Sequence, residues 1–267
     1  MKYGFIGAGN IAEALISGMV MAKVADSENI FIHDINKQRV QFLEDKLNVS
    51  VAAHAAELCA QCAVIFLTVK PDIIGIVLTE VRNELNKHKP LIISIAAGKS
   101  IGFIEELLGF EASVARVMPN TNAAVAESMS LICVNDNVSE QQLSIIEHCF
   151  NAIGKTCVIN EDKMPILTAL CGCAPAFTYL FIESLAKAAH KNGVDKKTAM
   201  SLAVQTVLGS AKLLEQTKDK SVWEQIDAVC SPGGMTIQGV CSLEESGFST
   251  AVLKAVEIAA QKDSKLK

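Results

Sequence analysis

The sequence predicts an α/β domain followed by an all-helical domain. Up to about Ile159, short apolar runs alternate with amphipathic stretches, a pattern typical of strands and helices that alternate around a parallel sheet. After Glu161 the β-branched runs vanish and helical periodicity takes over. A chain of 267 residues is long enough for two domains. We therefore expect one domain over residues 1–160 and a second over residues 161–267.

Strands in the first part are predicted where apolar and β-branched residues cluster. The expected strands are Lys2–Ile6, Ile30–His33, Ala63–Thr68, Leu91–Ile95, Ser113–Val117, Ser130–Val134 and Thr156–Ile159. Helices are expected at Lys37–Leu47, after the second strand, and at Ser139–Ile153, between the last two.

The second part is predicted to be helical throughout. Asp195 and Ser221 have the residue types of N-caps, and Gly193 and Gly247 are suited to end helices. The expected helices are Ala176–Lys191, Asp195–Gln216, Ser221–Val229, Met235–Glu245 and Phe248–Lys262.

Apolar residues occupy more than one face of the helices between Ala176 and Gln216. A small bundle cannot bury that much apolar surface alone, so we expect a second copy of the chain to cover it. The stretch Met164–Ile182 carries no charge and approaches the length of a membrane span. Because it contains Pro165, Gly172 and Pro175, we expect a buried interface there and no membrane partner.

Composition excludes several functions. The net charge of −5 argues against a nucleic-acid partner, and the first strand starts too early for a signal peptide. Nine cysteines without such a signal indicate a reducing, cytoplasmic location. The pair Cys59-x-x-Cys62 lacks a second pair of ligands, so we expect buried thiols and no metal site.

A glycine-rich turn lies between the first strand and an apolar helix. Gly7–Ala12 has the form G-x-G-x-x-A, follows Tyr3–Ile6, and precedes a helix that continues to Met21. Asp34 ends the second strand, where a carboxylate binds the ribose hydroxyls of a dinucleotide. The combination predicts a Rossmann-type domain that binds a dinucleotide cofactor.

The choice between NADH and NADPH stays open on the residues alone. Asp34 favours NADH because its charge repels a 2′-phosphate, yet Asn36, Lys37 and Arg39 follow closely and offer groups that bind phosphate. The alternative role for Asp34 is the N-cap of the Lys37–Leu47 helix, and both roles are compatible.

Two further loops follow strands, at the sheet edge where ligands of open α/β sheets bind. They are Thr68–Pro71 and Ala96–Gly98. Lys70 is a candidate phosphate partner, although a solvated loop lysine is an equal alternative. The predicted cofactor-binding residues are Ile6, Gly7, Ala8, Gly9, Asn10, Ile11, Asp34, Val69, Lys70, Pro71, Ala96 and Ala97.

A turn with two glycines lies between two predicted helices near the C-terminus. Ser231 is suited to cap the following helix and Pro232 to its first position, while Gly233 and Gly234 leave backbone N–H groups open to a carboxylate. Thr236 adds a free hydroxyl one turn further on. The alternative is an ordinary connection between helices.

These motifs, in this order and spacing, resemble the pyrroline-5-carboxylate reductase family over essentially the whole chain. The residues that carry the resemblance are Gly4–Ile16 with Gly18, Val69–Pro71, Ala96–Gly98, Arg116–Thr121, and Ser231–Gly234 with Thr236. The resemblance implies a Rossmann domain, a helical dimerisation domain, and reduction of Δ1-pyrroline-5-carboxylate to L-proline by NADPH or NADH, the last step of proline biosynthesis. It also implies self-association as a dimer or a larger assembly of dimers.

The resemblance further implies the substrate site. Thr236 would bond the ring nitrogen as the catalytic residue, and the helix start at Gly233 and Gly234 would hold the substrate carboxylate. The implied substrate-binding residues are Glu161, Ser231, Gly233, Gly234, Met235 and Thr236. The chain departs from the family where Cys171–Phe177 replaces Ser-Gly-Ser-Gly-Pro-Ala-Tyr, and also at Ala55, Asn122 and Met235.

Two alternatives remain open on the sequence. A β-hydroxyacid dehydrogenase would share the two-domain plan but needs a lysine base near Cys171–Phe177, and the nearest downstream lysine is Lys187. A non-catalytic relative that binds a dinucleotide and dimerises is the second alternative. No histidine lies in a motif loop, so we expect no dedicated histidine acid.

Overall fold

A computed structural model of the chain describes residues 1–263. The polypeptide divides into two units: the first contains Met1–Gly172 together with the chain from Ala259 onward, and the second contains Cys173–Ile258. Residues 264–267, the end of the predicted helical domain, lie outside the described residues. The two units are described separately below.

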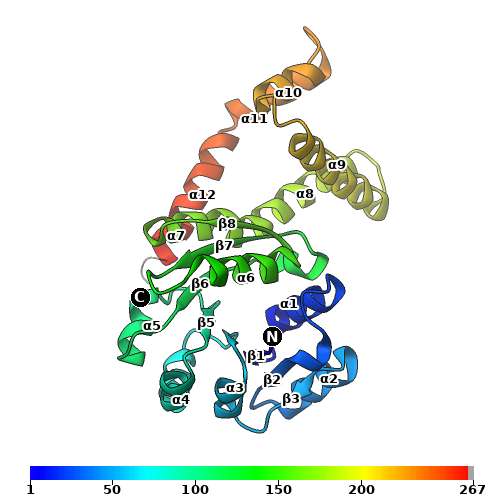
Figure 1. Cartoon of the computed structure of the whole chain (residues 1–267). Coiled ribbons are helices and arrows are strands. Elements are labelled where there is room, and N and C mark those ends of the chain that lie inside the picture. The colour runs from blue at the N-terminus through cyan, green and yellow to red at the C-terminus, as the bar shows by residue number, and fades with distance from the viewer. Residues whose placement is uncertain (264–267) are drawn as a thin grey trace. The chain divides into compact units, whose positions relative to one another are not determined.

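The first unit is built on an eight-stranded sheet with the strand order β3-β2-β1-β4-β5-β6-β7-β8 (Figure 1). Neighbouring strands are parallel, apart from the antiparallel pair β6 and β7. The order reverses direction at β1 and β4, so the loops after these strands border the crevice in which such sheets bind ligands. The strands are β1 Tyr3–Ile6, β2 Ile30–His33, β3 Ser50–Val51, β4 Val64–Leu67, β5 Leu91–Ser94, β6 Val114–Met118, β7 Ser128–Val134 and β8 Gly154–Val158.

Helices cover both faces of this sheet, which explains the nearly unbroken apolar sequence of its central strands. One apolar core contains residues of α1, α2 and α6, and the other contains residues of α3, α4, α5 and α7. The helices are α1 Asn10–Met21, α2 Lys37–Leu47, α3 Ala55–Gln61, α4 Ile74–His88, α5 Ile101–Leu108, α6 Glu140–Asn151 and α7 Met164–Thr168. Short 3₁₀ turns are η1 Ser27–Asn29, η2 Thr121–Val125 and η3 Glu161–Lys163.

Aromatic packing fixes β1 against β4. The rings of Phe5 and Phe66 stack with centroids 4.4 Å apart, and Phe150 from α6 lies 6.2 Å from Phe66. All three side chains are fully buried, and each contributes on the order of 2–3 kcal/mol of hydrophobic free energy. This packing holds the ends of β1 and β4 rigid beneath the loops that follow them.

The seven predicted strands are present, with end shifts of at most two residues, and the structure adds several elements that the sequence did not predict. The short edge strand β3 was not predicted, because two residues give no periodic signal. The helix α7 and the π-helical turn η4, Ala169–Cys173, also precede the first helix predicted for the second part. Their uncharged sequence gave no amphipathic pattern from which to recognise them.

The second unit consists of helices, as predicted. Asp195 caps α9 by accepting a hydrogen bond from Thr198 N, and Ser221 forms a capping box with Glu224 at α10. Gly193 and Gly247, after helices α8 and α11, have φ values of 94° and 77°, which suit glycine. The helices are α8 Ala174–Lys191, α9 Lys196–Gln216, α10 Val222–Val229, α11 Met235–Glu245 and α12 Phe248–Asp263, whose last turn belongs to the first unit.

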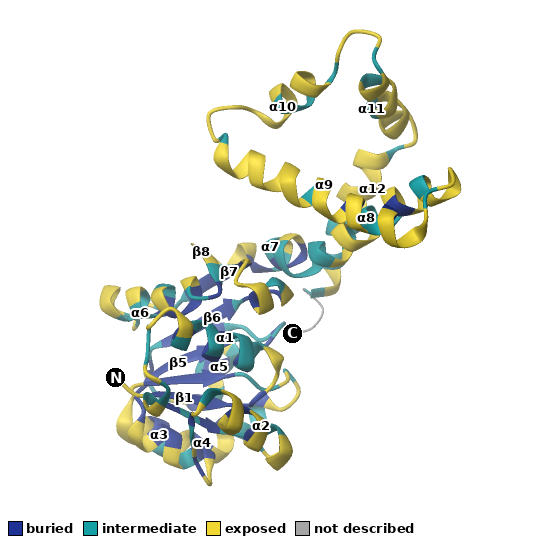
Figure 2. Cartoon of the chain, turned by 90° about the vertical axis from the view of Figure 1, so that its right-hand side faces the viewer, coloured by how far each residue is buried: buried dark blue, intermediate teal, exposed yellow. Residues whose placement is uncertain are grey.

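Most residues in the helices of the second unit are exposed (Figure 2). Many of these exposed residues have large apolar side chains. Leu180 on α8, Leu202 on α9 and Leu253 on α12 are each more than 60% exposed. The helical run Glu161–Lys191 is also long and apolar enough to cross a membrane, because it contains an 18-residue window with a mean hydropathy of 1.7. One such run is weak evidence for a membrane span, and apolar faces on several further helices are typical of an interface between subunits.

We predict that Leu180→Asp weakens self-association, because an aspartate in an apolar interface loses several kcal/mol of hydration. Ile76→Asp on α4 is the matched control, since both side chains are 66% exposed and only Leu180 belongs to the helical unit. Light scattering at micromolar concentration should give a dimer or larger assembly for the wild type and the control, and a smaller species for Leu180→Asp. A well-folded wild-type monomer would contradict this interface.

Candidate functional site: a dinucleotide pocket and an anion-binding helix start

The loop after β1 comes close to the backbone after β4. Gly7 has a φ of 108° and donates its N–H to His33 O at 2.8 Å. A Cβ atom on Gly7 would lie 2.7 Å from the carbonyl carbon and oxygen of Thr68, so no side chain fits there. Gly9 caps α1, and a Cβ atom at Gly9 would meet nothing within 4 Å. The loop is therefore packed on its inner side and open at the helix start, as a dinucleotide requires.

A cavity of about 460 Å³ lies beside this loop. Six predicted cofactor-binding residues line it: Ile6, Gly7, Gly9, Asp34, Val69 and Lys70. The other lining residues were not in the predicted set of cofactor-binding residues: His33, Ile35, Ala55, Thr68, Asp72, Ile73, Val77 and Glu80. The size and the open glycine backbone fit the adenosine part of a dinucleotide.

Among these other lining residues, Thr68 has the most contacts with the glycine loop. Its hydroxyl donates to Ile6 O at 3.0 Å and Gly7 O at 2.7 Å. Thr68 begins the Thr68–Pro71 loop that was predicted at the ligand-binding edge of the sheet, and its hydroxyl is the part of that loop that holds the glycine loop.

Asp34 holds the glycine loop from the neighbouring strand. One carboxylate oxygen, Oδ2, accepts a hydrogen bond from Ala8 N at 2.7 Å, and the other, Oδ1, accepts from Asn36 N at 2.8 Å. The alternative assignment of Asp34 as the helix N-cap is wrong, because the Asn36 side chain caps α2 by accepting from Arg39 N. Asp34 is left at the rim of the cavity, where a ribose would bind.

The remaining predicted cofactor residues are distributed around the loops. Ala8 and Ala96 are buried, and Ile11, Pro71 and Ala97 are half-buried. Asn10 lines a second cavity, of about 560 Å³, that runs along α1 to Met21. These residues do not line the 460 Å³ cavity, and their roles stay predictions.

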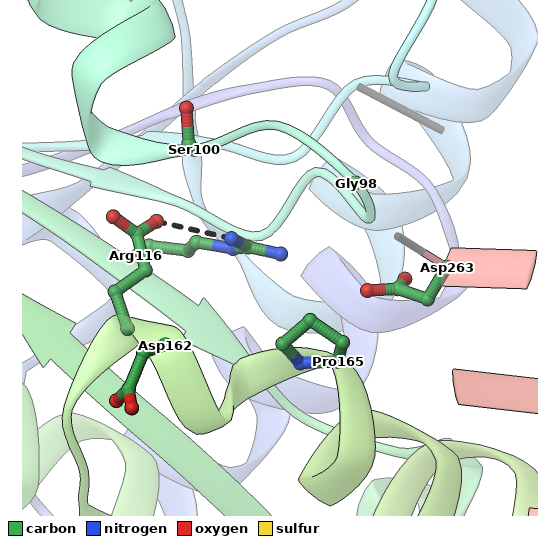
Figure 3. Close-up of a pocket in the computed structure, with 7 residues that line it drawn as sticks. Gly98, Ser100, Arg116, Asp162, Pro165 and Asp263 are labelled. Carbon is green, nitrogen blue, oxygen red and sulfur yellow. Dashed lines mark hydrogen bonds and ion pairs between the residues drawn. The ribbon is translucent and has the colours of Figure 1, made fainter. Parts of the chain in front are cut away.

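Glu161 lies in a third cavity of the first unit, of about 290 Å³. Its Oε1 accepts from Arg116 Nη1 at 3.0 Å and from Ile101 N, the first residue of α5, at 2.9 Å. Arg116 and Asp263 point toward each other across the cavity (Figure 3). Burial raises the pKa of Asp263, and the Arg116 charge opposes that rise. Glu161 thus joins the start of α5 to the sheet.

The other predicted substrate-binding residues belong to the second unit and are brought together at the start of α11. Pro232 and Gly233 form a tight turn in which Gly234 N donates to Ser231 O at 2.9 Å, and Gly233 has a φ of 69°. The turn requires glycine at this positive φ. Met235 and Thr236 then begin the helix, and both are exposed.

The capping arrangement expected for this turn is wrong in detail. Gly234 is the N-cap of α11, so Ser231 does not cap the helix and Pro232 is not its first residue. The first intrahelical bond runs from Gln238 N to Gly234 O. The backbone N–H groups of Met235, Thr236 and Ile237 therefore point out of the helix start, the arrangement that binds carboxylates.

The cysteines are free thiols. Cys59 and Cys62 are buried between α3 and β4, and burial raises their pKa values to about 12 and about 11. Within residues 1–263, no group of three or more histidine, cysteine or acidic side chains is placed to hold a metal ion. Unionised, buried thiols act as small apolar side chains.

The glycine loop, the acid after β2 and the adjoining cavity define a dinucleotide-binding oxidoreductase of the Rossmann type. Comparisons with known proteins identify its family. Residues 161–266 match the family model described as pyrroline-5-carboxylate reductase dimerisation, and residues 2–98 match the model described as NADP oxidoreductase, coenzyme F420-dependent.

Full-length relatives agree. The chain is 38% identical to pyrroline-5-carboxylate reductase of Methanosarcina acetivorans over 99% of this chain and 97% of the relative. Among solved structures, the NADP-bound Plasmodium falciparum pyrroline carboxylate reductase is 36% identical with a TM-score of 0.89, covering 100% of this chain and 98% of that one. The Coxiella burnetii enzyme is 31% identical with a TM-score of 0.94 and the same coverage. The chain belongs to the pyrroline-5-carboxylate reductase family.

We predict that Asp34→Ser raises the efficiency with NADPH relative to NADH. A carboxylate about 4–6 Å from a 2′-phosphate costs on the order of 1 kcal/mol in a partly solvated site, so its removal should change the ratio of the two kcat/KM values about fivefold or more. Steady-state kinetics with each cofactor measure this ratio. An unchanged ratio would mean that Asp34 acts only on the backbone of Ala8 and Asn36.

Proposed function

We propose that this chain reduces Δ1-pyrroline-5-carboxylate to L-proline with NADPH or NADH, and that the turn before α11 binds the substrate. The observation that carries the proposal is the start of α11, where three outward backbone N–H groups lie next to the Thr236 hydroxyl. The membership of the pyrroline-5-carboxylate reductase family supports the reaction. The glycine loop and its cavity supply the cofactor site.

The proposed roles follow from the charges of the substrate. Its carboxylate accepts hydrogen bonds at the α11 start, aided by the helix dipole, with Ser231, Gly233, Gly234 and Met235 forming the surrounding surface. The bound nicotinamide cofactor supplies a hydride for the imine carbon. The Thr236 hydroxyl, which has no hydrogen-bond partner among the described residues, bonds the ring nitrogen as the imine becomes an amine.

The catalytic contribution of the protein is mainly positioning. A protonated cyclic imine already has an electrophilic carbon, so the protein must hold this carbon near van der Waals contact with the hydride donor. On this mechanism the reaction would need no dedicated histidine acid. We assign Glu161 to the substrate region on the family resemblance, and its ion pair with Arg116 would hold the carboxylate in position there.

We also propose that residues 1–160 bind the cofactor and that residues 161–267 bind the substrate and form the dimer. The start of the family match at residue 161 supports this boundary. The predicted cofactor-binding residues, including Asn10, Ile11, Pro71, Ala96 and Ala97, keep their proposed role on the resemblance. A cytoplasmic location is proposed as well, supported by the free cysteines.

A direct assay separates the proposed reaction from its alternatives. Oxidation of NADPH or NADH, followed by absorbance, should depend on added pyrroline-5-carboxylate. A β-hydroxyacid dehydrogenase would instead reduce the cofactor with a hydroxy acid. A non-catalytic relative would bind the cofactor without turning over either substrate.

Thr236→Ala should lower kcat and kcat/KM together by roughly one to three orders of magnitude, because it removes a bond that strengthens in the transition state. Thr236→Val should be no more active than Thr236→Ala. Thr236→Ser keeps the hydroxyl and should retain most of the wild-type activity. Thr250→Ala, at the third residue of α12, is the matched control and should keep normal kinetics.

Melting curves distinguish catalysis from helix support. If Thr236 only stabilises the start of α11, the alanine variant should lose about 1 kcal/mol of stability with kcat unchanged. The serine variant would then also be impaired, through lost methyl packing. That pair of results would refute the catalytic role of Thr236 and leave the overall reaction untouched.

A further inference from the structure

Glu13 connects two cations of α2 to the helix that follows the glycine loop. Its Oε2 accepts a hydrogen bond from Arg39 Nη2, and its Oε1 accepts from Lys46 Nζ at 2.6 Å. The Glu13 side chain is 21% exposed and that of Arg39 is 24% exposed, so this pair is largely shielded from water. The Lys46 ammonium, together with Arg39, holds the pKa of Glu13 below its ordinary value.

Arg39 is fixed by two further contacts. Its Nε donates to Ala8 O in the glycine loop at 2.6 Å, and its guanidinium carbon lies 4.9 Å from the centre of the Phe42 ring. The planar guanidinium therefore donates from Nε to the glycine loop and from Nη2 to Glu13. A guanidinium held at several points loses much of its freedom to turn toward another anion.

The position of Arg39 matters for the adenosine end of the cofactor. Asp34 lies at the rim of the cavity, and Arg39 is the third residue of the helix that starts just after it. NADPH differs from NADH by a 2′-phosphate, and an arginine near the acid after β2 accommodates that phosphate in NADP-binding domains. Arg39 is the arginine in this position, and the loop and Glu13 already hold it.

We propose that Glu13 is a positioning residue that sets the cofactor preference: it holds Arg39 on the glycine loop, and this chain thereby prefers NADH to NADPH. Glu13 acts together with Asp34, because one residue retains the cation and the other repels the phosphate. The inference depends on the proposed function only for the identity of the cofactor. It is testable without any imine substrate.

The experiment measures Kd values of NADH and NADPH by fluorescence titration of the full-length protein. The variants are Glu13→Gln, the double variant E13Q/R39A, and Glu44→Gln. Glu44 is the matched control, because it is an acid on α2 that bonds Gln41 and makes no contact with Arg39 among the described residues. Melting curves verify that each variant is folded.

Wild-type protein should bind NADH more tightly than NADPH. Glu13→Gln should lower the ratio of the NADPH Kd to the NADH Kd about tenfold, the size of one charge-assisted hydrogen bond. The ratio should return toward the wild-type value in E13Q/R39A and stay unchanged in Glu44→Gln. Should Glu13→Gln fail to fold, Glu13→Ala replaces it in both the single and the double variant.

Three results would overturn the inference. The first is tighter binding of NADPH than NADH by the wild type, and the second is an unchanged Kd ratio in the Glu13 variant. The third is a Kd ratio that stays lowered in E13Q/R39A, which would mean that the loss of the Glu13 charge acts without Arg39. In each case, turnover of pyrroline-5-carboxylate by the wild type separately decides the proposed function.

Discussion

The shape of the cofactor site depends on two hydrogen bonds that fix the backbone of Ala8 in the glycine loop. Asp34 accepts the N–H of Ala8, while Arg39 donates to its carbonyl, so two side chains from one neighbouring segment hold this residue from both sides. Gly7 adds a close backbone contact with Thr68 that no side chain would permit. The loop is thus rigid before a ligand arrives, which reduces the entropy lost on binding. The same two contacts fix the positions of a carboxylate and a guanidinium beside the loop.

The helical unit has a different requirement. Its helices bury little surface within the single chain, and only Ala186, Ala199 and Ala203 form a small core. Self-association, which the dimerisation family model supports, supplies the missing apolar contacts. The exposed turn before α11 belongs to this unit. The helices that bury apolar surface between subunits therefore also carry the helix start that we propose as the substrate-binding site.

The sequence predicted the elements that have a strong period or a clear cap. The bounds of β2, α2 and α11 agree with prediction, and both predicted caps at Asp195 and Ser221 are confirmed. It did not predict that Asn36 rather than Asp34 caps α2, because both residue types suit a cap and only the tertiary bond to Ala8 decides between them. Likewise, the Arg39 contacts join residues 26 and 31 positions apart, which local patterns cannot reveal.

The central claim is hydride transfer to the imine carbon of pyrroline-5-carboxylate. Its most direct test uses a nicotinamide cofactor carrying deuterium at the transferred position of C4, with NMR analysis of the product. Our account predicts L-proline with one deuterium at C5, formed in equal amount to the cofactor oxidised. Oxidation of the cofactor without labelled proline, or no oxidation at all in the presence of the imine, would contradict it.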